Sequence, residues 1–396
     1  MKKSNQFYTD LNLINLPIFT ASKKIKNERK IEEIILDKNG IKTKLIIQFP
    51  EEKLTFFDRK VLATIEYLFC HRYNVISLEE AYIKEYDKTK DWYLKEFKKK
   101  EKELKESDKQ QIIYETMNNL QKAFKLGLTL KNINDFVYNK TYGHSKVKKS
   151  LLKLQNTYIK QESDYFIDGS RLELPEIPLL TFSSSREQKS NNNSRENIII
   201  SLNAFHLVNL MKKNFVISDL KLLTSFDSSI AGRLSELIKK SLYGSKIFNK
   251  DKVSFPYEYI SEYLQIEKRG SLSRIKQQLE EPFKELIDKK IIVNWLLQKN
   301  LFDYEIVFFH SLQFYENYWE NLEEITKKLI NQGLAKLIRQ EDKYKKFEEE
   351  VNTFMETVKV KDSAEKERIK IFYIKYYYLD NYLKSEVEEN TNFIRC

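Results

Sequence analysis

Residues 228–310 decide the fold, because they contain two long amphipathic stretches, SSIAGRLSELIKKSLYG (228–244) and LSRIKQQLEEPFKELIDKKII (272–292). In each stretch, apolar residues recur at intervals of three and four, which is the spacing of a helix with one buried face. The first helix is expected to end before Gly244, a residue type that favours helix termination. The second stretch predicts a long helix over 271–289.

Shorter elements lie between and after these two helices. A helix is expected at 257–264, and a glycine-containing turn at 268–270 leads into the long helix. Alternating apolar residues at 291–298 and 304–309 predict a β-hairpin directly after it. Helix, helix, turn, helix and hairpin is the order of a winged-helix domain, whose last helix enters a DNA groove.

A similar order occurs earlier in the chain. The stretch LTFFDRKVLATIEYLF (54–69) predicts a helix, and two more helices are expected at 130–139 and 145–158, followed by strand-like segments. Sequence rich in Lys and Glu at 77–126 separates the first helix from the other two. We expect it to form a solvent-exposed helical insertion, whose last helix is ended by Gly127.

The predicted fold is therefore α+β and mainly helical, with two tandem winged-helix domains and a helical C-terminal extension. An Asn-Gly turn near the N-terminus predicts a further hairpin. The expected parts are an N-terminal segment with this hairpin at 1–50, the first winged-helix domain at 51–205 with its insertion at about 77–126, the second at 206–310, and the extension at 311–396.

Composition argues against several classes of protein. The 396 residues contain no apolar run long enough to cross a membrane, and two cysteines cannot form a disulfide framework, so a cytoplasmic protein is expected. The eight glycines form neither of the common phosphate-binding loops, and the four histidines lack metal-ligand spacing. These absences argue against ATPases, Rossmann enzymes, zinc hydrolases and histidine-metal nickases, so we expect no catalytic or metal-binding residues and no cofactor.

The charge is unevenly distributed. The chain has a net charge of +11, but residues 1–310 carry +13 and residues 311–396 carry −2. A basic body favours a polyanionic partner. A lysine-rich composition explains the same charge without any partner, because 57 of the 69 basic residues are lysines. The two interpretations have equal weight on charge alone.

The third helix of each predicted domain carries the candidate DNA-binding residues. In KVKKSLLKLQNTYI (146–159), apolar side chains and lysines recur on separate faces, a division that suits a groove lined by phosphates. In the second domain we expect Arg274 to donate two hydrogen bonds to guanine and Gln277 to pair with adenine, while Arg269 holds phosphate. The candidates are Ser145, Lys146, Lys149, Ser150, Lys153, Asn156, Arg269, Ser271, Ser273, Arg274 and Gln277.

Each candidate also has a structural interpretation. The three lysines also fit a solvated helix face, and Arg274 also fits one partner of a surface ion pair with Glu280 or Glu281. Both interpretations stay open at the level of sequence.

Four stretches together (54–69, 146–159, 228–244 and 272–292) resemble plasmid replication initiators, the RepA-like tandem winged-helix Rep family. The resemblance covers roughly residues 50–310, and the insertion and the long tail depart from the family's compact form. It implies a bacterial, plasmid-borne protein that is not an enzyme. It also implies binding to repeated origin sites (iterons), opening of AT-rich DNA, recruitment of a host initiator or helicase, autorepression, and in many members a homodimer.

Other classes remain as alternatives. A winged-helix transcriptional regulator without a replication role would share the same pattern. With 24 tyrosines, a relaxase with a tyrosine nucleophile is conceivable, as is a primase, although relaxases normally need clustered histidines to hold a metal. A scaffold protein that uses winged helices to bind protein is a further alternative. None of these classes predicts a membrane partner.

Overall fold

The computed structural model describes residues 5–311, apart from gaps at 11–12, 15–16, 23–30, 39–40, 49–51, 74, 138–142, 168–169, 188–194, 212–214, 244–251 and 300–303, and eight single residues between 345 and 366. The chain divides into two compact units, Met1–Phe226 and Asp227–Cys396. The predicted helical extension lies almost wholly outside the described residues.

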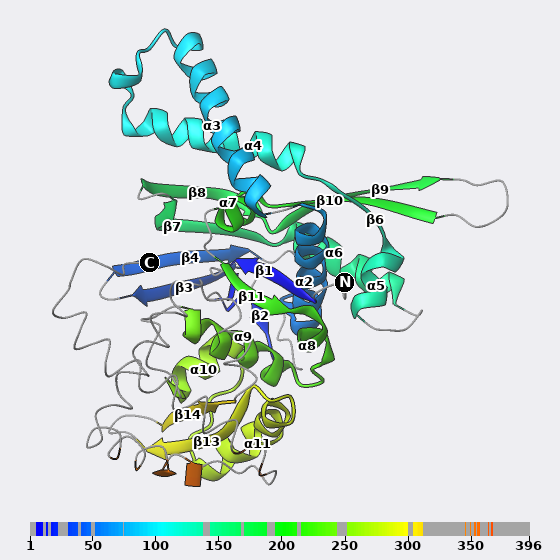
Figure 1. Cartoon of the computed structure of the whole chain (residues 1–396), viewed down its shortest axis with the longest axis vertical. Coiled ribbons are helices and arrows are strands. Elements are labelled where there is room, and N and C mark those ends of the chain that lie inside the picture. The colour runs from blue at the N-terminus through cyan, green and yellow to red at the C-terminus, as the bar shows by residue number, and fades with distance from the viewer. Residues whose placement is uncertain are drawn as a thin grey trace. The chain divides into compact units, whose positions relative to one another are not determined.

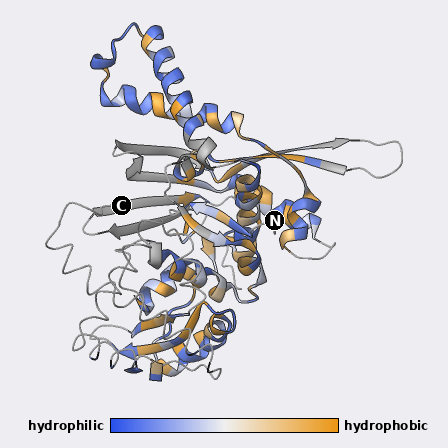
Figure 2. Cartoon of the chain, in the orientation of Figure 1, coloured by the Kyte–Doolittle hydropathy of each residue, from blue (hydrophilic) through white to orange (hydrophobic). Residues whose placement is uncertain are grey.

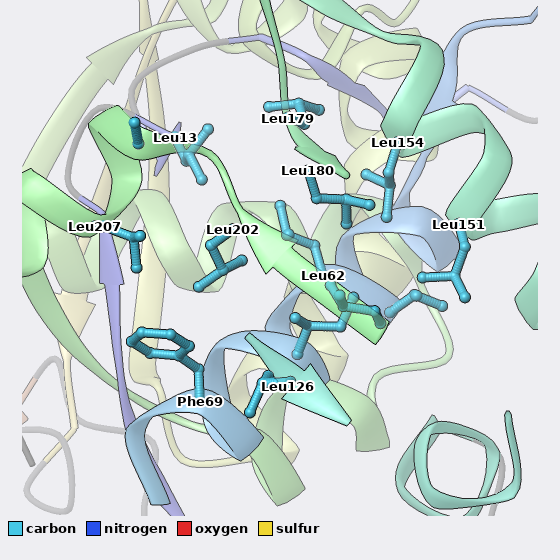
Figure 3. Close-up of a cluster of buried hydrophobic side chains, with 14 of the residues drawn as sticks. Leu13, Leu62, Phe69, Leu126, Leu151, Leu154, Leu179, Leu180, Leu202 and Leu207 are labelled. Carbon is cyan, nitrogen blue, oxygen red and sulfur yellow. The ribbon is translucent and has the colours of Figure 1, made fainter. Parts of the chain in front are cut away.

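Helix α2 (Phe56–Arg72) stands at the centre of the first unit. It begins where the sequence predicts, because Thr55 donates both its backbone N–H and its hydroxyl to the Asp58 carboxylate, at 2.7 and 2.8 Å. Its apolar face joins leucines from strands and helices far apart in the sequence, as Figure 3 shows. This cluster is the core of the first unit.

The described strands of the first unit form four sheets around this core (Figure 1). One is the antiparallel pair of β1 (Gln6–Asp10) and β11 (Phe215–Asp219). A second has the order β6-β10-β9, formed by Leu126–Thr129, Arg195–Leu202 and Leu180–Glu187. A third has the order β3-β4-β7-β8, formed by Ile31–Lys38, Ile41–Gln48, Tyr158–Ile167 and Ser170–Pro178, and it contains the N-terminal hairpin that the sequence predicts. The short strands β2 (Phe19–Thr20) and β5 (Leu54–Thr55) pair in parallel.

The predicted insertion is a helical hairpin of α3 (Val75–Glu96) and α4 (Glu106–Ala123), joined through a short 3-10 helix at Glu101–Glu103. It projects from the first unit, and its far end is hydrophilic (Figure 2). The expectation that Gly127 ends its second helix is wrong. Helix α4 ends at Ala123, and Gly127 lies in strand β6 opposite Ile199 of β10.

The first unit extends about twenty residues beyond the predicted boundary at 205/206. Helix α7 (Ala204–Met211) packs on α3, α4 and β1, and α8 (Leu220–Ser225) packs on α2. Strand β11 lies between them in the chain and pairs with β1. These contacts keep residues 206–226 with the first unit.

A buried polar network ties β1, α2 and α7 together. The Arg59 guanidinium donates to the Glu66 carboxylate at 2.8 Å, and both side chains are fully buried. The Thr9 hydroxyl donates to the same carboxylate at 3.2 Å. His206 Nε2 lies 3.2 Å from Glu66 Oε1. Burial, assisted by the charge on Arg59, lowers the pKa of His206 to about 3, so its ring is neutral at physiological pH.

The second unit follows the predicted order closely. Helix α9 (Ser229–Tyr243) is followed by β12 (Lys252–Pro256), α10 (Tyr257–Leu264), α11 (Leu272–Asp288), β13 (Ile292–Lys299) and β14 (Tyr304–His310). Phe283 of α11 packs edge-on against Trp295 and Phe308 of the hairpin, with 5.0 Å between the ring centres in each pair. Pro282 lies within α11 without ending it.

Both units share one arrangement of elements. In each, a strand precedes two helices and pairs with the last strand of a later hairpin, which gives the orders β6-β10-β9 and β12-β14-β13. In the second unit this hairpin follows the helices directly, whereas in the first unit β7 and β8, which belong to another sheet, come between α6 and β9. The two helices are α5 (Leu130–Val137) and α6 (His144–Asn156) in the first unit, and α10 and α11 in the second. The fold is α+β, with helices predominating over small sheets.

Candidate nucleic-acid interface

Helix α6 has one buried and one exposed face. Val147, Leu151 and Leu154 are fully buried in the core of the first unit. The opposite face is exposed at intervals of four, three and four residues. Its members are Ser145, Lys149, Leu152 and Asn156.

The lysines of α6 do not form the uniform stripe that the sequence suggests. Lys149 remains largely exposed, although its ammonium lies 3.2 Å from a Glu52 oxygen. Lys153 is mostly buried and lies 2.7 Å from the other Glu52 oxygen. Lys146 is exposed, with its ammonium 4.3 Å from the centre of the Phe57 ring. Lys146 and Lys149 are therefore the better placed of the three to reach a phosphate.

Glu52 forms an acidic counterpart to this helix. The hydrogen bonds from Lys153 and Lys149 hold the pKa of its carboxyl below the usual range, so Glu52 is an anion across the physiological pH range. Its negative charge offsets the positive charge of these two ammonium groups. The sequence carries no local signal for this pairing, because Glu52 precedes Lys149 by 97 residues.

Ser150 does not belong to the exposed face of α6, contrary to its place among the predicted DNA contacts. Its side chain is buried, since position 150 falls on the same side of α6 as Val147, Leu151 and Leu154. It cannot meet a groove from this position. The exposed residue on the outward face that sequence analysis missed is Leu152, which follows Lys149 by three positions and could have been found from that spacing.

Helix α11 presents a second outward face. Ile275, Leu279 and Phe283 are buried, which fixes the orientation of the helix. The candidates Ser271, Ser273, Arg274 and Gln277 are all exposed. Within the described part of the chain, Arg274 makes no ion pair with Glu280, Glu281 or any other carboxylate, so its guanidinium is available to an external acceptor.

The turn before α11 is held by a buried tyrosine. The Tyr257 hydroxyl accepts the backbone N–H of Arg269 at 3.0 Å and donates to Gln278 at 2.7 Å. The Arg269 guanidinium pairs with Glu267 at 2.8 Å and remains partly exposed. Tyr257 thus fixes the backbone of Arg269 in the turn before α11, and the Arg269 guanidinium stays accessible to solvent beside Glu267.

Among the described residues, no group of three or more His, Cys, Asp or Glu side chains is arranged to hold a metal ion. None of the described helices is long and apolar enough to cross a bilayer.

No protein-family model matches the chain, and no curated protein matches it. Among solved structures, domains 2 and 3 of RctB are similar with a TM-score of 0.41 and 10% identity, covering 74% of this chain and 94% of that one. A second RctB structure of the same domains has a TM-score of 0.38 and 8% identity, with coverages of 77% and 98%. The Pi initiator protein in complex with iteron DNA has a TM-score of 0.33 and 14% identity, with coverages of 47% and 81%. Scores below 0.5 do not establish a common fold.

Proposed function

We propose that this chain is a sequence-specific double-stranded DNA-binding protein with two winged-helix modules, and that it initiates replication at a plasmid origin. The observation that carries the proposal is the repeated arrangement of elements, in which α6 and α11 each turn a polar, partly cationic face to solvent. A recognition helix that enters the major groove presents such a face, which supports the proposal.

The two kinds of contact have separate tasks. Lys146 and Lys149 of α6 and Arg269 before α11 hold phosphates, which sets the position of the protein on the duplex without reading sequence. Arg274 has the two parallel donors that match the acceptors of guanine, and Gln277 can pair with adenine. Ser145, Asn156, Ser271 and Ser273 contribute weaker contacts, and Lys153 contributes charge from behind Glu52.

The replication role rests on the resemblance of residues 50–310 to Rep-type initiators. In that role the protein binds iterons as a monomer or homodimer, opens the adjacent AT-rich DNA and recruits a host initiator or helicase. It also represses its own gene. No step in this scheme needs catalysis by the chain, in keeping with a protein that is not an enzyme.

The test is selection of bound DNA from a random pool, followed by affinity measurements on the selected and on scrambled DNA across a range of salt concentrations. Arg274→Ala should cost about 1–3 kcal/mol on the selected site and relax the preference at one base pair. Lys149→Ala should weaken binding to both DNAs and reduce the salt slope by roughly one.

The outcomes separate the competing functions. Equal affinity for selected and scrambled DNA would remove sequence-specific binding, and failure to bind any DNA would favour a protein scaffold. A selected site that recurs as direct repeats beside an AT-rich tract supports the initiator. The same site found only in a promoter would favour a transcriptional regulator. Nicking of supercoiled origin DNA with Mg²⁺ would indicate a relaxase.

A further inference from the structure

A leucine stands on the outward face of α6, where the other exposed side chains are polar. Leu152 is 44% exposed, although α6 is held in place by Val147, Leu151 and Leu154, which are fully buried. Leu152 is therefore not needed for the packing of the helix. Its neighbours one turn away on the same face are Lys149 and Asn156, both exposed.

Single exposed leucines are common on protein surfaces, so exposure alone does not indicate a function. The position of Leu152 on the face proposed to meet DNA does. In the major groove, thymine presents a 5-methyl group, which is an apolar feature that guanine, adenine and cytosine lack. An aliphatic side chain between a phosphate-binding lysine and an asparagine is suited to meet such a group. The same side chain would leave the amino group of cytosine without a hydrogen-bond partner.

We infer that Leu152 is a specificity-determining residue that contacts the 5-methyl group of one or two thymines in the site bound by the first unit. This inference rests on the proposed function, since it requires α6 to lie in the major groove. It adds a source of base preference that neither the charge pattern nor the polar candidates of α6 provide.

Deoxyuridine offers a direct probe, because it pairs like thymine and lacks only the methyl group. Burial of one methyl-sized group changes a binding constant by about fourfold. Full-length protein should therefore bind about fourfold more weakly when deoxyuridine replaces a contacted thymine of the selected site. Replacement of the other thymines should have no such effect.

The variants assign this effect to Leu152. Leu152→Ala should bind the thymine and deoxyuridine forms equally, and Leu152→Met, which keeps an aliphatic side chain, should retain the difference. Ile83→Ala is the matched control, because Ile83 is 54% exposed on α3 and has no part in the proposed interface. Thermal unfolding of the variants checks that they are folded.

Two results would overturn the inference. One is wild-type protein that binds its selected site equally with thymine or deoxyuridine at every position. The other is a thymine preference that Leu152→Ala retains in full. Both presuppose sequence-specific binding, so they differ from a failure to select any DNA, which would instead remove the proposed function.

Discussion

Glu52 shows how one acidic side chain can limit the affinity of a basic helix. Its two oxygens lie 3.2 Å from the Lys149 ammonium and 2.7 Å from that of Lys153, two groups that the proposed function brings near phosphates. Glu52→Gln should release the Lys149 ammonium, leave that of Lys153 beside the Asp58 carboxylate at 3.8 Å, and remove one repulsive charge. We expect affinity for any duplex to rise by about three- to tenfold at low salt, with a steeper salt dependence, as measured by fluorescence anisotropy.

The control for this prediction is Glu96→Gln, which removes the same charge from an exposed position in α3. A gain of the same size in both variants would mean that only net charge matters. A gain that persists when Lys149→Ala and Lys153→Ala are added to Glu52→Gln would also contradict the local mechanism.

His206 predicts a pH dependence of stability. Its pKa is lowered to about 3 in the folded protein, against about 6.5 in an unfolded chain, so the unfolded state binds more protons between these values. Folding stability should therefore be complete above about pH 6.5 and fall as the pH decreases, by up to about 1.4 kcal/mol per pH unit from this residue. Urea unfolding at pH 7, 6, 5 and 4 measures the slope.

The slope should be shallower in His206→Gln, even if this variant is less stable at every pH. His144→Gln, which removes an exposed histidine, should keep the wild-type slope. Identical slopes in wild type and His206→Gln would show that the ring takes up a proton without unfolding.

At the scale of elements, the helical hairpin depends on Asp108 near the start of α4. The carboxylate of Asp108 accepts from the Lys99 ammonium at 2.7 Å, from the Lys105 backbone N–H at 2.9 Å and from the Tyr93 hydroxyl at 2.8 Å. These hydrogen bonds lower the pKa of Asp108 to about 2, and the bond from Lys99 has the largest effect. The tip should thus be fully ordered above about pH 4 and lose order as the pH falls toward 2.

Asp108→Asn should produce the same loosening at neutral pH. Amide hydrogen exchange at residues 97–105 should become faster, while exchange in α2 stays unchanged. Asp91→Asn, an exposed aspartate of α3, is the control. Unchanged exchange at the tip of Asp108→Asn would mean that α3 and α4 hold the turn without this carboxylate.

Elements with strong local signals were predictable from the sequence, and those that depend on distant partners were not. The helix at Tyr257–Leu264 begins directly after Phe255-Pro256, where the sequence predicts it, and the hairpin of β13 and β14 follows the long helix as expected. Strand β6 was missed because Gly127 follows an amphipathic helix, whereas pairing with β10, some 70 residues later, decides its conformation. The pairing of β1 with β11, which moves the boundary to 226/227, is equally non-local.

The candidate site divides in the same way. Exposure of Arg274 and Gln277 follows from the helical period, because Ile275 and Leu279 fix the buried side of α11. The contacts of the α6 lysines do not follow from the helical period. They depend on Glu52 and on the Phe57 ring, both of which precede α6 by about ninety residues. Helical periodicity thus predicts on which side of a helix a residue lies. Its contact partner depends on the folded chain.

At the scale of the whole molecule, one chain carries both modules. The first unit ends at Phe226 and the second begins at Asp227. Binding of one module therefore raises the effective concentration of the other at a neighbouring site. We expect the selected DNA to contain two half-sites about one helical turn apart, both protected in a footprint. A footprint over a single half-site would contradict tandem binding.

Spacing provides the decisive measurement. An insertion of about five base pairs turns the second half-site to the opposite side of the duplex, so affinity should fall at least about tenfold, toward that of DNA in which the second half-site is scrambled. Arg274→Ala should weaken binding to the original DNA and have little further effect on the DNA with the insertion, because the second module no longer reads bases there. An insertion without effect on affinity, or an Arg274→Ala penalty that is the same on both DNAs, would mean that the modules do not read the site together.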